Sequence, residues 1–350
     1  MNQTIKTAIT SFGMSGLVFH GPALKVNPGF EVVNILERSK NISKKLFPEA
    51  TIVRNYNDIL NNPAIELVVV NTPDKFHYEM AKLAILHGKH VVVEKPVTLN
   101  SIQAQELVEL ACEKEVVFTV YQNRRWDGDF ITVRKILEEN KLGRLVEFES
   151  HYDRYRNFIT PETWKEEGGE FAGVLYNLGS HMVDQAYVLF GKPVSVTTHL
   201  KIVRTGGMVT DYYDLRLEYE NFSALLKCSY LVKKPGPRYI LHGELGSFFK
   251  SGIDPQEEML KAGNLPTGEN WGADAPEFWG TISYQKDGND FEEVVETIPG
   301  NYNIFYDNVF DAIRKGAELL VKPEEAVEVL KILEACIKSN RDKRTILLEN

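Results

Sequence analysis

The hydrophobic and polar positions change their rhythm about a third of the way along the chain. Up to residue 124, short β-branched runs alternate with segments of helical periodicity, which is typical of stacked βαβ units and a parallel sheet. Gly88 would close one of the helices and Ser101 would be the N-cap of another. The predicted strands are "TIKTAIT", "FEVVNIL", "IELVVVNT", "HVVVEKP" and "VVFTVYQN", and the predicted helices are "LVFHGPALKVN", "YNDILNN", "FHYEMAKLAILHG" and "SIQAQELVELACEKE".

After Arg125, two-residue alternation predominates. One helix, "DFITVRKILEENKLG", precedes the segments "RLVEFESHYDRYR", "SVTTHLKIVR", "DYYDLRLEY", "SALLKCSYLV", "RYILHGELGSFFK" and "GTISYQKDG". Such alternation is typical of an antiparallel sheet with one buried face, and an amphipathic helix begins just after Pro323. We predict an α/β chain. A doubly wound parallel sheet over residues 1–124 is followed over residues 125–350 by an α+β domain with a large, open, mostly antiparallel sheet. The C-terminal helix would pack back on the first domain.

Composition and charge exclude several classes of function. The 350 residues are 43% hydrophobic and 25% charged, as expected for a folded globular protein. A net charge of -9 argues against a nucleic-acid partner, whose phosphates require a basic surface. We see no membrane-spanning stretch and no secretory signal, so we expect a cytoplasmic protein without a membrane partner. Cys112, Cys228 and Cys336 are widely spaced, which predicts reduced thiols and no metal site.

A glycine-containing turn, "SFGMSG", follows the first predicted strand. A dinucleotide turn needs small residues for the tight bend, for the approach of pyrophosphate to backbone amides and for packing of helix on strand. Ser11, Gly13 and Gly16 occupy these three places, and Phe12 lies between the first two. The alternative is a polar turn in another kind of α/β protein.

The segment "LERSK" ends the second predicted strand, where the ribose of the adenosine would lie. Glu37 could accept hydrogen bonds from the ribose hydroxyls, which favours NAD. Arg38, Ser39 and Lys40 are instead the donors that the 2'-phosphate of NADP would need, although Arg38 and Lys40 would also suit a solvated loop. We favour NAD slightly, because a carboxylate facing a phosphate is costly unless Arg38 neutralises it.

Three longer segments together resemble a known family. They are "NTPDKFHYEMAKLAILHGKHVVVEKPVT", "YQNRRWDGDF" and "GVLYNLGSHMVDQ". They resemble the glucose-fructose oxidoreductase/inositol dehydrogenase/MocA family of NAD(P)-dependent sugar and polyol oxidoreductases, over essentially the whole chain. "GLVFHGP" and "NRRWDGDF" are most similar to the scyllo-inositol dehydrogenase branch. In that branch the glycine turn is normally complete, so Ser11 is a departure that a small side chain should tolerate.

The resemblance implies a catalytic set. The segment Glu94-Lys95-Pro96 would bring Lys95 to the nicotinamide, often through a cis peptide before the proline. Oxidation of a secondary alcohol needs a hydride acceptor, a group that stabilises the developing alkoxide and a base for the hydroxyl proton. NAD(P), the Lys95 ammonium and His181 would supply these in turn.

Asn177 stands four residues before His181, on the same face of a predicted helix, where the family normally has aspartate. An aspartate would orient the imidazole and raise its pKa, whereas an asparagine can orient a ring or a hydroxyl but adds no charge. Well-tuned general-base catalysis is worth about 10²–10⁴-fold, so a dehydrogenase could survive the change. A different substrate, proton transfer centred on Lys95 and a purely structural asparagine are the alternatives.

The resemblance also implies further site residues, and the alternation of "ESHYDRYRNF" adds Asp153 and Tyr155. Arg125 and Trp126 would form the pocket wall, although Trp126 could be an anchor between domains and Asp127 an N-cap. Around the cofactor, we expect Thr72, Pro73 and His77 near the ribose and pyrophosphate, Glu94 near the ribose, and Gln122 and Asn123 at the nicotinamide end. For the substrate, we expect Asp153, Tyr155 and Arg238, with Tyr239 as a further candidate.

Together these expectations favour an NAD(P)-dependent dehydrogenase of a cyclic polyol or sugar, inositols before aldoses. The second domain would bind substrate and form a homodimer or a dimer of dimers through its uncovered sheet face. The main alternative is a cofactor-binding sensor or regulatory protein that kept the fold and lost turnover. A glycoside hydrolase that uses NAD as a transient oxidant, which also occurs in the wider family, comes last.

Overall fold

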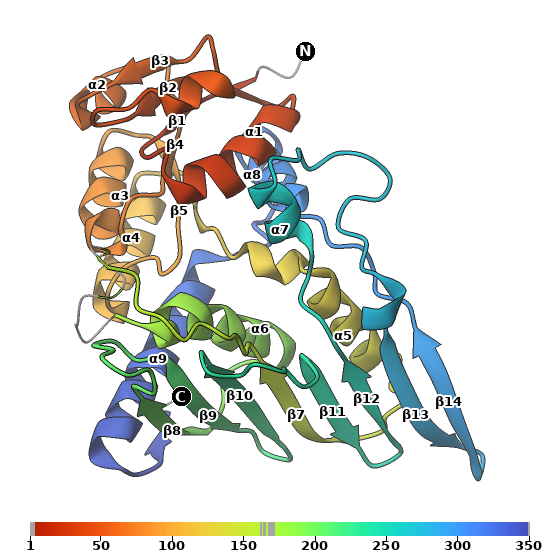
Figure 1. The fold of residues 1–350 in the computed structure, drawn as a ribbon. Helices are drawn as coiled ribbons and strands as arrows, with labels where there is room; N and C mark the ends of the chain where they lie inside the picture. The colour runs from red at the N-terminus through yellow and green to blue at the C-terminus, as the bar shows by residue number, and fades with distance from the viewer. Residues whose placement is uncertain (1–3, 162, 164–165, 167–171, 349–350) are drawn as a thin grey trace. The chain divides into compact units, whose positions relative to one another are not determined.

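The structure is a computed structural model that describes residues 4–161, 163, 166 and 172–348 (Figure 1). The chain forms two compact units. Unit 1 comprises Met1–Asp127, Pro255–Gly272 and Gly300–Val327, and unit 2 comprises Gly128–Asp254, Ala273–Pro299 and Glu328–Asn350. Two segments from later in the chain therefore belong to the same unit as the N-terminal region.

Unit 1 is built on a six-stranded parallel sheet of order β3-β2-β1-β4-β5-β6. The order reverses between β1 and β4, and ligands of doubly wound sheets bind at the carboxyl ends of the strands beside this reversal. Every residue of β4 is buried, because in such folds helices cover both faces of the sheet. The strands are β1 (Ile5–Ile9), β2 (Phe30–Leu36), β3 (Thr51–Val53), β4 (Leu67–Val70), β5 (His90–Val93) and β6 (Phe118–Val120).

The helices of unit 1 include short 3-10 and π turns at the carboxyl edge of the sheet. They are η1 (Gly16–His20), α1 (Gly21–Val26), η2 (Ile42–Lys45), α2 (Tyr56–Leu60), η3 (Asp74–Phe76), α3 (His77–Leu86), α4 (Ser101–Glu113), η4 (Asn123–Trp126), α7 (Gln256–Lys261) and α8 (Asn303–Lys315). The long helix α9 (Pro323–Asp342) begins in unit 1 and continues in unit 2.

Unit 2 is built on a nine-stranded sheet of order β14-β13-β12-β11-β7-β10-β9-β8-β15. Every neighbouring pair is antiparallel except β7 and β10. The strands are β7 (Leu145–His151), β8 (Ser195–Lys201), β9 (Tyr212–Glu218), β10 (Ser223–Ser229), β11 (Tyr239–Gly243), β12 (Gly246–Lys250), β13 (Gly280–Lys286), β14 (Asn289–Val295) and β15 (Ile346–Leu347). The two sheets confirm the predicted fold class.

Alternation along the strands of unit 2 gives the sheet one buried and one open face. On β9, Tyr213, Leu215 and Leu217 are fully buried and the residues between them are not. The Tyr213 hydroxyl lies 2.7 Å from the sulfur of Met182 on α6, so this helix covers the buried face. Figure 1 shows α5 (Gly128–Glu138) and α6 (Ser180–Phe190) on the same face, with η6 (Leu175–Gly179) leading into α6. The short turn η7 (Pro276–Phe278) precedes β13.

Several local predictions need correction. Asn100, not Ser101, is the N-cap of α4: its side chain accepts the Gln103 amide at 2.9 Å, and Ser101 is the first helical residue. The helix predicted at "LVFHGPALKVN" begins as the π turn η1, with the Gly21 amide bonded to the carbonyl of Gly16. The segment "RYILHGELGSFFK" forms two strands, β11 and β12, rather than one. The short strand β3, the charged strand β14 and helices α7 and α8 were not predicted.

Candidate active site

The predicted pyrophosphate turn follows β1. The Gly13 amide donates to Ser11 Oγ at 3.4 Å, and Phe12 is buried edge-to-face against Phe47 with ring centroids 6.2 Å apart. A Cβ at Gly16 would lie 2.3 Å from the Ser11 carbonyl oxygen, so only glycine fits there. A Cβ at Gly13 would meet Ser11 Oγ at an ordinary 3.6 Å. The turn is therefore closed by packing at Gly16 and open to an approaching ligand at Gly13, as a dinucleotide turn requires.

Asn71, which the sequence reasoning passed over, holds this turn in place. It follows β4 and is buried, and its side-chain amide donates to the Ser11 carbonyl at 2.8 Å and to Ser15 Oγ at 3.2 Å. Its backbone amide donates to Thr10 Oγ1 at 3.1 Å. The carboxyl ends of β1 and β4 are thus fastened together beside the reversal in strand order. A polar residue directly after the buried run "LVVV" was the available signal.

At the predicted ribose position, the Glu37 carboxylate turns into its own loop. It accepts the Ile42 amide at 2.9 Å, the Ser43 amide at 3.0 Å and the Ser43 hydroxyl at 2.5 Å. Burial alone would raise the pKa of Glu37, but these hydrogen bonds and the nearby Arg54 hold the pKa below its usual value. Arg38, Ser39 and Lys40 are exposed. The Glu37 carboxylate is therefore hydrogen-bonded within its own loop, whereas Arg38, Ser39 and Lys40 are exposed to solvent.

The Glu94-Lys95-Pro96 segment follows β5, and the Lys95–Pro96 peptide bond is cis. Lys95 and Glu94 are half-buried, and the Lys95 backbone amide donates to Glu94 Oε2 at 3.1 Å. Glu94 Oε1 lies 3.1 Å from Nε2 of the fully buried His20, whose Nδ1 lies 2.7 Å from the Tyr306 hydroxyl. A neutral His20 that donates to Glu94 and accepts from Tyr306 satisfies all three groups.

This contact sets the charge of Glu94. Its burial would raise the pKa, but the hydrogen bond from His20 and the charge of Lys95 hold the pKa of Glu94 below its usual value. A carboxylate is therefore present beside Lys95 at neutral pH. The segment "GLVFHGP" contains His20 but does not indicate its role, because the contacts of His20 to Glu94 and Tyr306 are non-local.

Thr72, Pro73 and His77 lie between β4 and α3, at the same edge of the sheet. Thr72 and Pro73 are half-buried, and Pro73 precedes η3. His77 is only 1% exposed, and its two ring nitrogens lie 2.8 Å from the carbonyl oxygens of Thr72 and Pro96.

Gln122 and Asn123 follow β6 and are both buried. The side-chain Oε1 of Gln122 is buried and accepts a hydrogen bond from none of the described residues. A buried acceptor of this kind suits a ligand that brings its own N–H donor, such as the carboxamide of nicotinamide. Together with the open position at Gly13, it makes the carboxyl edge of the unit 1 sheet fit a nicotinamide dinucleotide.

Arg125 and Trp126 are both buried and make their described contacts within unit 1. The Arg125 guanidinium donates to Glu325 Oε2 at 2.7 Å and to the Leu320 carbonyl at 3.1 Å. Trp126 packs edge-to-face on Phe305, with ring centroids 6.1 Å apart. These contacts give both residues a structural role, and their contact with a substrate stays a prediction.

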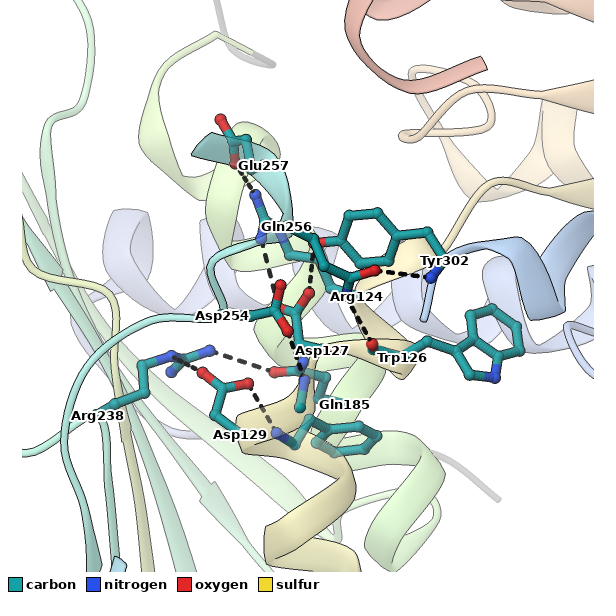
Figure 2. A network of polar contacts seen from close by, with 12 residues as sticks. Arg124, Trp126, Asp127, Asp129, Gln185, Arg238, Asp254, Gln256, Glu257 and Tyr302 are labelled. Carbon is teal, nitrogen blue, oxygen red and sulfur yellow. Dashed lines mark hydrogen bonds and ion pairs between the residues drawn. The ribbon is translucent and has the colours of Figure 1, made fainter. Parts of the chain in front are cut away.

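The neighbouring Arg124 ties the end of this segment to α7. Its guanidinium forms ion pairs with Glu257 and, at 3.3 Å, with Asp127, and Asp127 also accepts the Tyr302 hydroxyl at 2.6 Å (Figure 2). Gln256 donates to the Trp126 carbonyl at 3.1 Å. The carboxylate of Asp127 therefore belongs to a buried polar network just before α5.

Asn177 and His181 lie in unit 2. Asn177 is half-buried in the π turn η6, and His181 is the second residue of α6 and only 5% exposed. The Asn177 side chain hydrogen-bonds to Tyr230; burial raises the pKa of Tyr230, whereas Arg154, Arg156 and this hydrogen bond oppose the rise. π turns often occur at functional sites. Because α6 directly follows η6, Asn177 and His181 lie on one continuous helical segment.

Asp153 and Tyr155 follow the end of β7 at His151, in an extended stretch bonded to the end of β10. Asp153 Oδ1 accepts the Ser229 amide at 3.0 Å. Tyr155 is 50% exposed and forms an isolated bridge with Leu231. Asp153 is thus held by the backbone, while the half-exposed Tyr155 ring has Lys233 Nζ 5.6 Å from its centre.

Arg238 lies in a buried cluster of unit 2. Its guanidinium donates to Ser150 Oγ at 2.5 Å, pairs with Asp129 at 3.5 Å and stacks on the Tyr239 ring at 4.3 Å. Gln185 accepts from both Arg238 and Tyr239, as Figure 2 shows for Arg238. These contacts make Arg238 a core residue of this unit, and its role in substrate binding stays a prediction.

Comparison with known proteins gives one family for both parts of the chain. Residues 5–122 match the oxidoreductase family's NAD-binding Rossmann fold, and residues 134–348 match the family's C-terminal alpha/beta domain. The chain is 41% identical to scyllo-inositol 2-dehydrogenase (NADP(+)) IolW of Bacillus subtilis over 99% of this chain and 97% of the relative. It is 37% identical to the uncharacterized oxidoreductase YdgJ of Escherichia coli over 99% and 100%.

Solved structures agree. Bacillus subtilis yvaA, assigned to the oxidoreductases, superposes with a TM-score of 0.97 at 41% identity, covering 100% of this chain and 99% of the other. A Bacteroides fragilis protein with the same assignment gives 0.91 at 44% identity, covering 99% and 100%. The chain belongs to the Gfo/Idh/MocA family and is an NAD(P)-binding oxidoreductase.

The described residues include no helix long and apolar enough to cross a membrane. Over the same residues, no cluster of three or more potential metal ligands occurs.

Proposed function

We propose that the protein transfers a hydride between NADP and a secondary alcohol carbon of a cyclic polyol or sugar, with inositols as the first substrate class. The observation that carries the proposal is the position of Lys95 at the carboxyl end of β5, beside the Glu94 carboxylate and in the same unit as the glycine turn. The likeness to a relative named as an inositol dehydrogenase supports the substrate class.

Each residue has one role in this proposal. Bound nicotinamide supplies the hydride acceptor. The Lys95 ammonium stabilises the negative charge that develops on the substrate oxygen, and His181 accepts the hydroxyl proton. Asn177 orients a substrate hydroxyl or the imidazole by hydrogen bonding, within reach of Tyr230. Glu94 holds a negative charge beside Lys95.

The choice of NADP over NAD rests on Glu37. Although its carboxylate would suit the ribose hydroxyls of NAD, three hydrogen bonds from Ile42 and Ser43 occupy it. The donors Arg38, Ser39 and Lys40 are exposed beside it and suit a 2'-phosphate. We therefore favour NADP in place of the slight preference for NAD that the residue types alone suggested, and the name of the relative, which specifies NADP(+), supports this choice.

The test is a turnover assay that follows absorbance of the reduced nicotinamide. Purified protein is offered inositol isomers and aldoses with NADP or NAD, and the corresponding cyclic ketones or lactones with NADPH or NADH. We expect NADP-linked turnover with at least one cyclic polyol, reduced at least 10²-fold by Lys95→Ala, the size of effect seen when a charge-stabilising group is removed. Lys114→Ala, at the exposed C-cap of α4, is the matched control and should be fully active.

Cofactor binding without turnover in either direction would contradict the dehydrogenase and favour the sensor. Turnover that Lys95→Ala leaves intact would remove Lys95 from the mechanism.

A further inference from the structure

The ring of His77 makes two contacts that restrict its chemistry. Nδ1 lies 2.8 Å from the carbonyl oxygen of Pro96, and Nε2 lies 2.8 Å from the carbonyl oxygen of Thr72. The side chain is buried at the first turn of α3, so water does not compete for these contacts. His77 therefore joins the loop after β4 to the cis-proline loop after β5.

A carbonyl oxygen can only accept a hydrogen bond, and a neutral imidazole has one donor and one acceptor nitrogen. Two carbonyl partners therefore need two N–H donors, which only the imidazolium form has. A neutral ring would place a nitrogen lone pair 2.8 Å from a carbonyl lone pair at one end. Turning the ring over does not help, because a C–H group needs about 3.3–3.6 Å to a carbonyl oxygen.

The other buried histidine at this segment has different partners. His20 lies between a hydroxyl, which can donate, and a carboxylate, which accepts, so one proton on its ring is enough. The Glu94 carboxylate belongs to the same loop after β5 and provides the negative charge that a buried imidazolium requires. The segment carrying Lys95 is thus held at its start by His20 and at its end by His77.

We propose that His77 is a positioning residue that fixes Lys95 by donating from both ring nitrogens, as an imidazolium, to the carbonyls of Thr72 and Pro96. The effect on catalysis rests on the proposed function. The protonation of His77 and its two hydrogen bonds, together called the clamp, do not. A misplacement of about 1 Å at a reacting group can cost about 10²-fold in rate, so loss of the clamp should act on Lys95 without removing any group that touches the substrate.

The first test reads the protonation directly and needs no activity. The full-length protein is labelled with ¹⁵N-histidine, and long-range ¹H–¹⁵N correlations are recorded at pH 7.5, with and without NADPH. His77→Gln assigns the His77 signals by their loss. We expect two protonated-type nitrogens for His77, while His20 gives one protonated and one bare nitrogen. A bare nitrogen on His77 would overturn the imidazolium clamp.

The second test separates positioning from folding. His77→Leu removes both donors, His77→Gln keeps an N–H donor, and His87→Gln changes an exposed histidine at the far end of α3 that contacts one carbonyl, that of Leu83. In the substrate-saturated assay we expect His77→Leu to lower kcat about 10- to 100-fold, with His77→Gln in between and His87→Gln unchanged. The KM for NADPH should change less than fivefold.

The positioning role would be overturned if kcat and cofactor affinity fell equally and in proportion to the loss of folded protein. That result would show a structural role only. If no substrate is turned over by the wild type, the proposed function fails, and the nitrogen signals still decide the clamp. His77→Gln provides the comparison if His77→Leu does not fold.

Discussion

Asn177 illustrates how much of a site depends on the kind of atom a residue presents. The sequence placed an amide where the family normally has a carboxylate, and the structure adds its partner, the hydroxyl of Tyr230. Tyr230 lies beside Arg154 and Arg156, whose positive charges lower its pKa against the effect of burial. A residue pattern cannot show this contact, because Tyr230 directly follows β10 and is far from Asn177 in sequence.

We expect Asn177→Asp to strengthen the base. A carboxylate near the imidazole raises its pKa by about 1 unit or more, so the acidic limb of the kcat/KM profile should move to higher pH. Asn177→Ala, which removes the amide without adding charge, should lower kcat/KM and leave the limb in place. Steady-state profiles from pH 5 to 9 provide the measurement. An unmoved limb in the aspartate variant would mean that His181 is not the titrating base.

Also at the residue scale, the choice between NADP and NAD depends on the orientation of the Glu37 side chain. Arg38→Ala should weaken NADPH binding about 10- to 100-fold, the value of one or two hydrogen bonds to a charged group, and leave NADH binding nearly unchanged. Ser43→Ala removes one of the donors that turn Glu37 inward and should improve NADH relative to NADPH. Calorimetric titration of both cofactors measures this. Equal effects of Arg38→Ala on both would contradict the assignment of the 2'-phosphate position.

At the scale of elements, periodicity predicted the strands that are buried and missed those that are not. β2 was predicted over "FEVVNIL", the residues that form it, because its alternation is strong. β14 was missed because its charged residues are exposed at the edge of the sheet, so no buried face marks it. α7 is short and its role is non-local: it was missed because its partners, Arg124 and Trp126, are far away in sequence.

The ion pair between α7 and Arg124 predicts a pH-dependent stability. Burial would raise the pKa of Glu257, but Arg124 and Lys261 lower it to about 2. Because the folded pKa lies below the unfolded value, this stabilisation is present above about pH 4.5 and is lost as the pH falls toward 2.

Glu257→Gln should therefore cost roughly 3 kcal/mol at pH 7, and less at pH 3.5. The exposed neighbour Glu258, which also contacts Lys261, gives the matched control Glu258→Gln, with a change below about 1 kcal/mol. Thermal unfolding at both pH values measures the difference. A cost for Glu257→Gln that does not shrink at low pH would contradict the account.

At the scale of the whole molecule, the unit 2 sheet presents an open face whose residues are polar and apolar in turn. Leu225 on β10 and Ile240 on β11 are half-exposed there, and Phe249 on β12 is 38% exposed. The sequence predicted a sheet with one buried face, but it cannot show what covers the other. The association through this face stays a proposal.

We expect a homodimer or a dimer of dimers that depends on this face. Leu225→Asp, on a central strand, should dissociate it, because an unpaired carboxylate would be buried in the interface. Leu320→Asp, at an exposed leucine of unit 1, should not. Light scattering during size-exclusion chromatography at micromolar concentration gives the mass. A monomeric wild type would refute the association.

The central claim is that a hydride passes between NADP and a ring carbon of a cyclic polyol under the control of Lys95. The most direct test incubates the protein with NADPH that carries deuterium at the transferable C4 position, together with the ketone of each active or candidate polyol. Mass spectrometry of the product should find one deuterium on the new carbinol carbon with the wild type and almost none with Lys95→Ala. NADPH that binds the wild type, yet transfers no deuterium to any member of the panel, would contradict the claim.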